Sequence, residues 1–177
     1  MKNNLLIYSS VDGQTKKICE RIIDSSLSKE SFEMVKIEDA DSININNFLQ
    51  IIVGASIRYG KHNKKVLSFI KKHKNLLDTK NTAFFSVNVV ARKKDKNTPY
   101  TNPYVLKFLK KTNWQPNKTA VFAGRIDYPK YNFIDKHIIR LIMFITSGPT
   151  DLTQSYEFTD WNSVDKFAKE ISNTSDY

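Results

Sequence analysis

Short apolar runs recur along the chain, and an amphipathic pattern follows most of them. The runs are residues 5–8, 33–37, 48–53, 82–87 and 119–123. Their length and polar or glycine boundaries predict strands buried on both faces of a parallel sheet. Apolar residues at a 3.6-residue period predict helices at Ile18–Leu27, from about Lys61, from Pro103, and from Trp161 to Ile171. Strands alternating with helices predict an open parallel α/β sheet with right-handed crossovers.

Two segments fall outside this alternation. Residues 39–47 are polar and predict a loop with one short helix. Residues 125–157 form an insert whose stretch Leu141–Ile145 is apolar all round. The insert is too short to span a bilayer and too apolar to be left in water. We expect an insert helix that covers part of a binding site or dips into a membrane interface, with packing on the domain core as the alternative.

The segments that follow the strands are the candidate site, because ligands of open α/β sheets bind beyond the carboxyl ends of the strands. They are Ser9–Thr15, Ala55–Gly60 and Asn88–Lys93. The first segment predicts a strand, a hydroxyl-rich turn with Gly13, and the start of a helix. Such a turn would offer backbone N–H groups and side-chain hydroxyls as donors to a phosphate. The turn matches neither the dinucleotide fingerprint nor the P-loop, and it holds no Lys or Arg. This favours a monophosphate such as that of FMN, with an ordinary capped turn as the alternative.

Composition adds limits to this picture. The 177 residues, 40% hydrophobic and 26% charged, predict one globular domain over residues 1–177. The single cysteine, Cys19, cannot form an intramolecular disulfide, which fits a reducing compartment and a packing role. Histidines and cysteine form no metal-ligand spacing, so we expect no metal. A secretory leader and a membrane-spanning stretch are both missing from the pattern, so we expect a location on the cytoplasmic side.

The net charge of +10 is concentrated in two segments. Residues 58–74 carry seven Lys or Arg and no acid, and residues 92–111 carry seven with one acid. The rest of the chain is therefore slightly acidic. A concentrated basic face predicts an anionic partner, which can be a nucleic acid, an anionic lipid or an acidic small molecule. The alternative is a lysine-rich surface that is merely solvated.

Several motifs resemble a known family. Residues 10–15, Ser-Val-Asp-Gly-Gln-Thr, resemble the flavodoxin phosphate loop, although Asp12 stands where flavodoxins usually carry Ser or Thr. Further stretches resemble the menaquinone-dependent protoporphyrinogen IX dehydrogenases, flavodoxin-like enzymes of bacterial haem synthesis. These stretches are residues 54–60, 86–93, 128–131 leading to 141–143, and 159–161. The similarity runs from Leu5 to about Ile171 and implies a flavodoxin-like five-stranded sheet of order 2-1-3-4-5 with the insert before the last helix.

The resemblance also implies a reaction. FMN would accept a hydride at N5 from protoporphyrinogen IX, giving protoporphyrin IX, and menaquinone or another quinone of the cell membrane would reoxidise it. The enzyme would then be peripheral on the cytoplasmic membrane surface. A general NAD(P)H-quinone reductase is the main alternative, and a flavodoxin-type electron carrier fits less well because such carriers are usually acidic. A nucleic-acid or lipid-binding module without catalysis is a further alternative, although we expect no nucleic-acid partner. Homo-oligomerisation stays open.

Individual residues take their expected roles from the resemblance. Tyr59 is the aromatic candidate for stacking on the flavin, and Asp12 is expected to cap the first helix or accept bonds within its turn. The expected cofactor-binding residues are Ser9, Ser10, Val11, Asp12, Gly13, Gln14, Thr15, Ser56, Ile57, Arg58, Tyr59, Gly60, Asn88, Val89, Val90, Ala91 and Arg92. The candidates for positioning the substrate propionates are Arg58, Arg92, Lys93 and Arg125, with Lys94 beside them. No side chain stands out as a general base.

Overall fold

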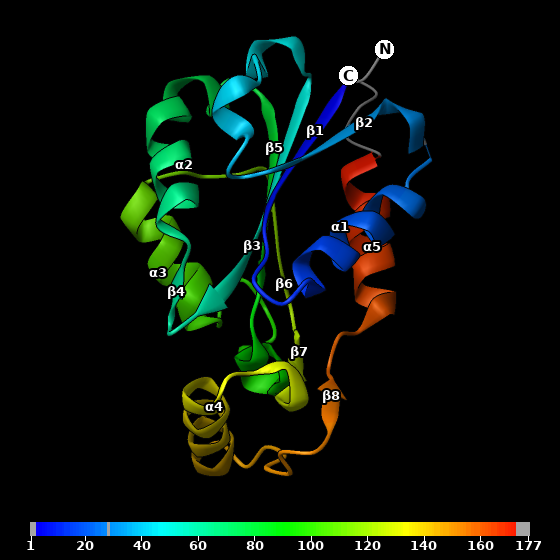
Figure 1. Ribbon diagram of the computed structural model, residues 1–177. Helices are drawn as coiled ribbons and strands as arrows, with labels where there is room; N and C mark the ends of the chain where they lie inside the picture. The colour runs from blue at the N-terminus through cyan, green and yellow to red at the C-terminus, as the bar shows by residue number, and fades with distance from the viewer. Residues whose placement is uncertain (1–2, 28, 173–177) are drawn as a thin grey trace.

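A five-stranded parallel sheet forms the centre of the computed structural model, which describes residues 3–27 and 29–172 (Figure 1). The spatial order is β2-β1-β3-β5-β6, which is the predicted 2-1-3-4-5 order of the five parallel strands and confirms the flavodoxin-like fold. The strands are β1 (Asn4–Ser9), β2 (Phe32–Lys36), β3 (Gln50–Arg58), β5 (Asn81–Val87) and β6 (Lys118–Phe122). β1 pairs in parallel with both β2 and β3, so the chain reverses its direction of winding at β1.

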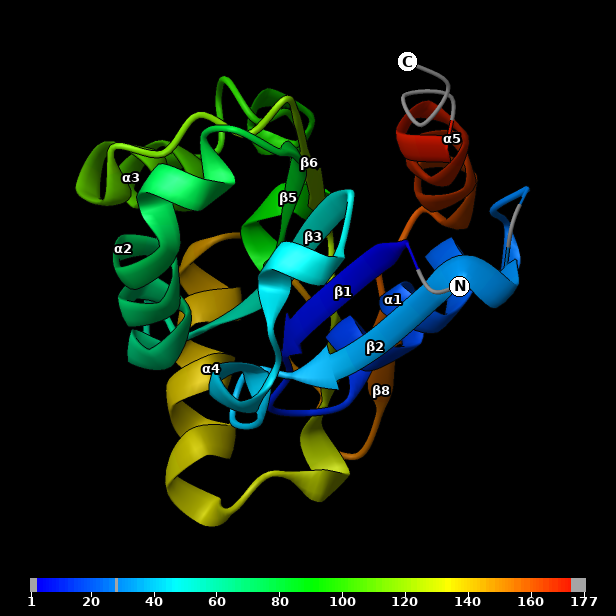
Figure 2. The same ribbon diagram turned by 90° about the horizontal axis from the view of Figure 1, so that it is seen from above.

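Helices cover the sheet on both faces (Figures 1 and 2). On one face α1 (Gln14–Asp24) packs beside α5 (Trp161–Ser172), and on the other lie α2 (Lys64–Leu77) and α3 (Pro103–Thr112). The two faces bury separate apolar clusters because neighbouring residues of a strand point to opposite sides. Leu6 of β1 belongs to the cluster under α1 and α5, whereas Leu5 and Ile7 belong to the cluster under α2 and α3.

The chain between β3 and α2 differs from the prediction. We expected a helix from about Lys61, but Lys61–His62 form the short strand β4, antiparallel to the end of β3. The reversal occurs at Tyr59 and Gly60, which both take positive φ angles, 48° and 72°. Helix α2 begins only at Lys64, where Asn63 accepts a bond from the N–H of Lys65 and caps the helix. The polar stretch 39–47 likewise holds two short 3-10 helices, Ala40–Ser42 and Ile45–Asn47, where one short helix was expected.

The insert lies beyond the carboxyl ends of the strands (Figure 1). It starts with β7 (Arg125–Asp127), a 3-10 turn at Tyr128–Lys130 and helix α4 (Phe133–Ile145), and returns through β8 (Ser155–Glu157), which pairs antiparallel with β7. Ile126, Tyr128 and Met143 form a small apolar core of its own. Among the described helices, α4 included, none has the length and apolar character needed to cross a membrane.

Candidate functional site

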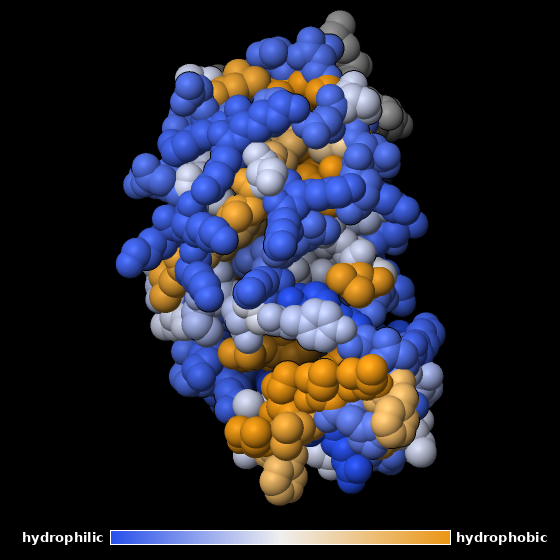
Figure 3. All heavy atoms as spheres, turned by 60° about the vertical axis from the view of Figure 1, so that its left-hand side comes forward, coloured by the Kyte–Doolittle hydropathy of each residue, from blue (hydrophilic) through white to orange (hydrophobic). Residues whose placement is uncertain are grey.

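A cavity of about 500 Å³ lies between the carboxyl ends of the strands and the insert. It is bounded by the turn after β1, the end of β3 with the turn that follows, the loop after β5, and α4. Figure 3 shows the hollow between the polar body of the domain and the apolar insert. The cavity is therefore where an open α/β sheet places a ligand, with a cover that the sheet itself does not provide.

The turn between β1 and α1 has features that fit a phosphate. Gly13 takes φ 85° and stands at the N-cap of α1, where no side chain caps the first backbone N–H groups. Across the residues that the structure describes, the hydroxyl oxygens of Ser10 and Thr15 are buried and have no hydrogen-bond partner. Buried hydroxyls are rarely left unsatisfied, since each costs free energy without a partner. Two such hydroxyls beside a helix amino terminus fit the oxygens of a phosphate monoester.

The polar residues that flank this turn, Ser9 and Gln14, have protein partners instead. The Gln14 side chain donates to Glu157 Oε1 at 2.8 Å and to Thr159 Oγ1 at 2.9 Å, which ties the turn to the end of β8. Ser9 Oγ accepts a bond from Asn63 Nδ2 at 3.1 Å and does not line the cavity. Gln14 lines the cavity but is engaged, so Ser10 and Thr15 are the side chains of this turn with free bonding capacity.

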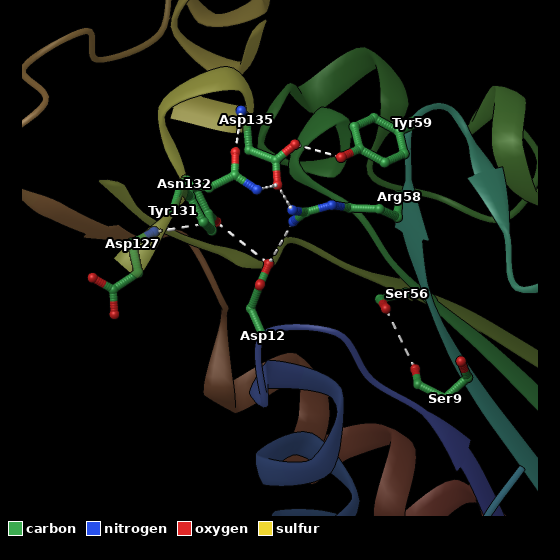
Figure 4. Close-up of polar contacts among 9 residues, drawn as sticks. All are labelled: Ser9, Asp12, Ser56, Arg58, Tyr59, Asp127, Tyr131, Asn132 and Asp135. Carbon is green, nitrogen blue, oxygen red and sulfur yellow. Dashed lines mark hydrogen bonds and ion pairs between the residues drawn. The ribbon is translucent and has the colours of Figure 1, made fainter. Parts of the chain in front are cut away.

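Arg58, at the end of β3, joins the turn between β1 and α1, residues 10–15, to the insert (Figure 4). Its Nη1 lies 3.2 Å from Asp12 Oδ2, and its Nη2 donates to Asp135 Oδ2 in the first turn of α4. The hydroxyl of Tyr59 donates to the other oxygen of Asp135, and the hydroxyl of Tyr131 lies 3.4 Å from Asp12 Oδ2. The guanidinium also lies near two rings, 5.3 Å from the centre of Tyr59 and 5.5 Å from that of Tyr131.

This cluster corrects the expectation for Asp12. Asp12 does not cap α1, whose N-cap is Gly13 without a side-chain bond. The carboxylate instead reaches across the site to Arg58 and Tyr131, so its charge is directed away from the donors of the turn. With Asp135 included, one guanidinium faces two carboxylates. Tyr59 is 67% exposed and lines the cavity, and its hydroxyl donates to Asp135; its expected stacking on the flavin stays a prediction.

The pKa shifts follow from these contacts. Burial raises the pKa of Asp12, and the Arg58 charge counters only part of this. Hydrogen bonding from Tyr59, with the nearby Arg58, holds the pKa of Asp135 below its ordinary value. Burial raises the pKa of Tyr131 to about 12, so this phenol stays protonated and donates. Burial acts to lower the pKa of Arg58, but the Asp12 and Asp135 charges outweigh it, so the arginine stays charged.

The other arginines proposed for the propionates also have protein partners. Arg92 Nη2 donates to the carbonyl oxygen of Thr146 at 2.8 Å and to its hydroxyl at 2.7 Å, which fastens the carboxyl end of α4. Arg125 forms an ion pair with Asp127 at 3.1 Å. Lys93 does not line the cavity. α4 is thus held at one end by Arg58 of β3 and at the other by Arg92 of the loop after β5, and a propionate role for any of these residues stays a prediction.

The loop after β5 rests on a buried polar network. Asn88 Oδ1 accepts bonds from the N–H of Ala91 at 3.2 Å and from Asn102 Nδ2 at 3.1 Å, and Asn88 Nδ2 donates to Ser86 Oγ at 3.1 Å. The other side of Ser86 Oγ contacts His62 Nε2 at 2.9 Å. Burial lowers the pKa of His62 to about 4, so the ring is neutral near pH 7. These contacts fix the short 3-10 helix Val89–Arg92 at the cavity.

The structure brings most of the predicted site residues to one cavity and adds others. Of the seventeen predicted cofactor-binding residues, all line it except Ser9, Gly13 and Ala91. Their contact with a cofactor stays a prediction. Sequence reasoning missed ten lining residues, which are Val87, Tyr104, Gly124, Ile126, Tyr131, Ile138, Ile139, Ile142, Met143 and Thr146. The apolar pattern of the insert was a signal for the α4 residues, but the pattern alone did not show which side of the helix faces the cavity.

The outer side of α4 is apolar and exposed. Phe133, Ile134, Leu141, Phe144 and Ile145 are 59–77% exposed. Figure 3 shows their region as an apolar band below the polar body of the domain. One side of α4 therefore covers the cavity, as expected for an insert helix over a binding site, and the other side faces outward. Entry of this helix into a membrane interface stays a prediction.

A metal centre finds no support in the described part of the chain. No three His, Cys, Asp or Glu side chains within residues 3–27 and 29–172 are grouped so that they could hold a metal ion.

Comparisons with known proteins add to this geometry. A family model described as a flavodoxin domain matches residues 5–153. Protoporphyrinogen IX dehydrogenase (quinone) from Leishmania major is 41% identical over 170 residues, covering 95% of this chain and 74% of that protein. The protein of the same name from Escherichia coli strain K12 is 38% identical over 175 residues, covering 97% and 96%. An archaeal flavodoxin structure is similar with a TM-score of 0.53 at 14% identity, covering 98% and 99%, which is a likeness of fold.

Proposed function

Because the chain belongs to the flavodoxin-domain family of quinone-dependent protoporphyrinogen IX dehydrogenases, we propose that it oxidises protoporphyrinogen IX to protoporphyrin IX and passes the electrons to a quinone. The observation that carries the proposal is the near-complete coverage of both chains in the comparison with the E. coli relative, 97% and 96%, at 38% identity. The match therefore includes the insert as well as the sheet.

The flavodoxin domain and the turn of residues 10–15, called the phosphate turn from here on, support a flavin cofactor, and we propose FMN. FMN would supply the redox chemistry, while the chain binds and orients it and excludes water. The phosphate would take the unpartnered hydroxyls of Ser10 and Thr15 and the first N–H groups of α1. The ends of β3 and β5, with their following turns, would then flank the flavin ring in the cavity. The absence of Lys and Arg from the turn fits a monoester held by neutral donors.

The insert supports an apolar substrate with acidic edges. Ile138, Ile139, Ile142 and Met143 of α4 give the cavity an apolar wall, which suits a macrocyclic ring. Arg58, Arg92 and Arg125 also line it, and a propionate would pair with one of them in exchange for part of that arginine's present contacts. A nicotinamide cofactor is not needed to explain why these residues line the cavity. The NAD(P)H-quinone reductase is therefore the alternative that the experiment below tests.

Membrane contact is the second part of the proposal. A quinone resides in the bilayer, and the exposed side of α4 is the apolar surface that would enter the membrane interface on the cytoplasmic side. Phe144→Glu places a charge on this surface and should release the protein from vesicles that contain anionic lipid. Leu27→Glu is the matched control, since Leu27 is 83% exposed but lies in the turn after α1, outside the insert. Equal sedimentation of both variants with vesicles would contradict this part.

An anaerobic experiment tests the reaction. The FMN-loaded protein is mixed with protoporphyrinogen IX, the flavin absorbance is followed, and a menaquinone analogue is then added. Bleaching, followed by recovery with rising porphyrin fluorescence, is the expected result. If porphyrinogen leaves the flavin unchanged but NADH or NADPH reduces it, the proposed reaction is wrong and the NAD(P)H-quinone reductase takes its place.

A further inference from the structure

The first turn of α4 places a carboxylate of the chain where a substrate carboxylate would be expected. Asp135 is 5% exposed, and its two oxygens accept bonds from Tyr59 and from the outer nitrogen of Arg58. Asn132 Nδ2 adds a third bond at 3.1 Å, and the Asn132 side chain accepts from the Asp135 N–H at 2.8 Å. The carboxylate is therefore bound as a ligand would be, by one guanidinium nitrogen, a phenol and an amide.

The charges around Arg58 leave no capacity for a further anion. The guanidinium already pairs with Asp12 and Asp135, so the three side chains together carry one net negative charge. A propionate entering the cavity could pair with Arg58 only by replacing one of these carboxylates. Asp12 is also close to Tyr131 and belongs to the phosphate turn, whereas Asp135 belongs to the helix that covers the cavity. Asp135 is the partner whose departure would open the site.

Few side chains of α4 are buried, so its amino-terminal half can move when Asp135 is displaced. Among its described residues, only Asp135 and Met143 have buried side chains. Met143 belongs to the insert core near the carboxyl end of the helix, which Arg92 also holds. The amino-terminal half depends on the contacts of Asp135, so their loss would free this half while the other end stays attached.

We propose that Asp135 is a selectivity gate, which holds α4 closed on Arg58 until a carboxylate of the substrate takes its place. The inference rests on the proposed function and deepens it, since it explains how a porphyrinogen with free propionates is selected over a neutral ring of the same size. The exchange replaces one ion pair by another and requires no net change of charge at Arg58. A neutral ring offers no such replacement and leaves the helix closed. Asp135 is in this sense a positioning residue, because it acts through Arg58 and α4.

Substrate discrimination tests the gate. The kcat/KM for protoporphyrinogen IX is compared with that for its dimethyl ester, using the FMN-loaded protein and a soluble quinone. We expect the wild type to prefer the free acid at least tenfold. Asp135→Asn should raise the kcat/KM of the ester at least tenfold, because an amide keeps the size but binds Arg58 weakly. Asp151→Asn is the matched control, because this exposed carboxylate of the insert bonds, among the described residues, with Thr153 of its own loop. It should leave the kcat/KM of both substrates unchanged.

Hydrogen exchange gives a readout that does not depend on turnover. In the protein without FMN, the backbone amides of the first half of α4 should exchange at least threefold faster in Asp135→Asn than in the wild type or Asp151→Asn. The unaltered protein provides a second measurement that needs no variant: added protoporphyrin IX should speed this exchange, and its dimethyl ester should not.

The outcomes separate the gate from the function. Equal use of acid and ester by the wild type, or an ester rate that Asp135→Asn leaves unchanged, overturns the gate while the function stands. Unchanged exchange in Asp135→Asn overturns it as well. If neither porphyrinogen reduces the flavin in any variant, the proposed function fails and the substrate assignment of the gate fails with it.

Discussion

Thr15→Val is the most direct test of the phosphate site. Thr15 is 1% exposed, lies in the first turn of α1, and its hydroxyl has no partner in the described structure. Valine keeps the branched shape and removes only the hydroxyl. Because the apoprotein makes no bond there, the substitution should leave its free energy of unfolding unchanged or raise it by up to about 1 kcal/mol.

FMN binding should respond in the opposite direction. A hydrogen bond to a charged group contributes about 1.5–3 kcal/mol, and each 1.4 kcal/mol changes an equilibrium constant about tenfold. The Kd for FMN should therefore rise roughly tenfold to a hundredfold. Titration of FMN fluorescence measures this change, and urea denaturation of the apoprotein measures stability.

Thr112→Val is the matched control. Thr112 is also buried, but its hydroxyl donates to the carbonyl oxygen of Phe108 at 3.0 Å. Its loss should cost the apoprotein about 1 kcal/mol and leave the FMN affinity unchanged. The reasoning would be refuted if Thr15→Val destabilised the apoprotein more than Thr112→Val did, or if it kept the wild-type Kd.

Three further predictions follow from the packing around the site. The pKa of His62 is lowered to about 4, whereas a histidine in the unfolded chain titrates near 6.5, so the unfolded chain takes up the proton first as the pH falls. The free energy of unfolding should therefore be highest above pH 6.5 and decrease by up to about 3 kcal/mol as the pH drops to 4. Urea unfolding should show a smaller decrease in His62→Gln. Gly54→Ala should destabilise by at least about 2 kcal/mol in the same assay, because a Cβ would lie 2.2 Å from the Phe85 ring; a nearly neutral effect would contradict this. Arg92→Gln should make the insert several times more sensitive to limited proteolysis by releasing the carboxyl end of α4, whereas equal cleavage in Lys93→Gln, the adjacent control, would contradict that role.

The sheet could be read from the sequence because its signals are local. Buried strands such as Leu5–Tyr8 are continuous apolar runs closed by turn residues, and most of them are followed by a 3.6-residue pattern. The turn at Tyr59 and Gly60 was missed because it depends on two residues with positive φ, of which only the glycine has a recognisable preference. The strand β4 that results is too short for any periodicity.

The site was predictable only where it follows the strands. Ser10 and Thr15 could be assigned because a strand-turn-helix fixes their place at the sheet edge. The pairing of Asp12, Arg58 and Asp135 could not, since these residues come from three separate parts of the chain. An arginine in a sequence shows a charge but not the carboxylates that already bind it, so Arg58 and Arg92 looked free for substrate. Asp135 and Thr146, which bind Arg58 and Arg92, lie in the insert, whose orientation no local pattern determines.

The positive charges of the cavity and those of the protein surface differ in their partners. Each arginine that lines the cavity is engaged: Arg58 and Arg125 by carboxylates, and Arg92 by the end of α4. The net charge of +10 therefore acts mainly on the outside, where most lysines of the basic segments 58–74 and 92–111 are exposed. Figure 3 shows the polar body of the domain above the apolar band of α4. A surface with lysines beside an exposed apolar helix suits an anionic bilayer, where long-range attraction and burial of the helix face act together. If so, raising the salt concentration should weaken the binding of the wild type to anionic vesicles without altering the acid preference, because that preference is set inside the cavity by the exchange at Arg58.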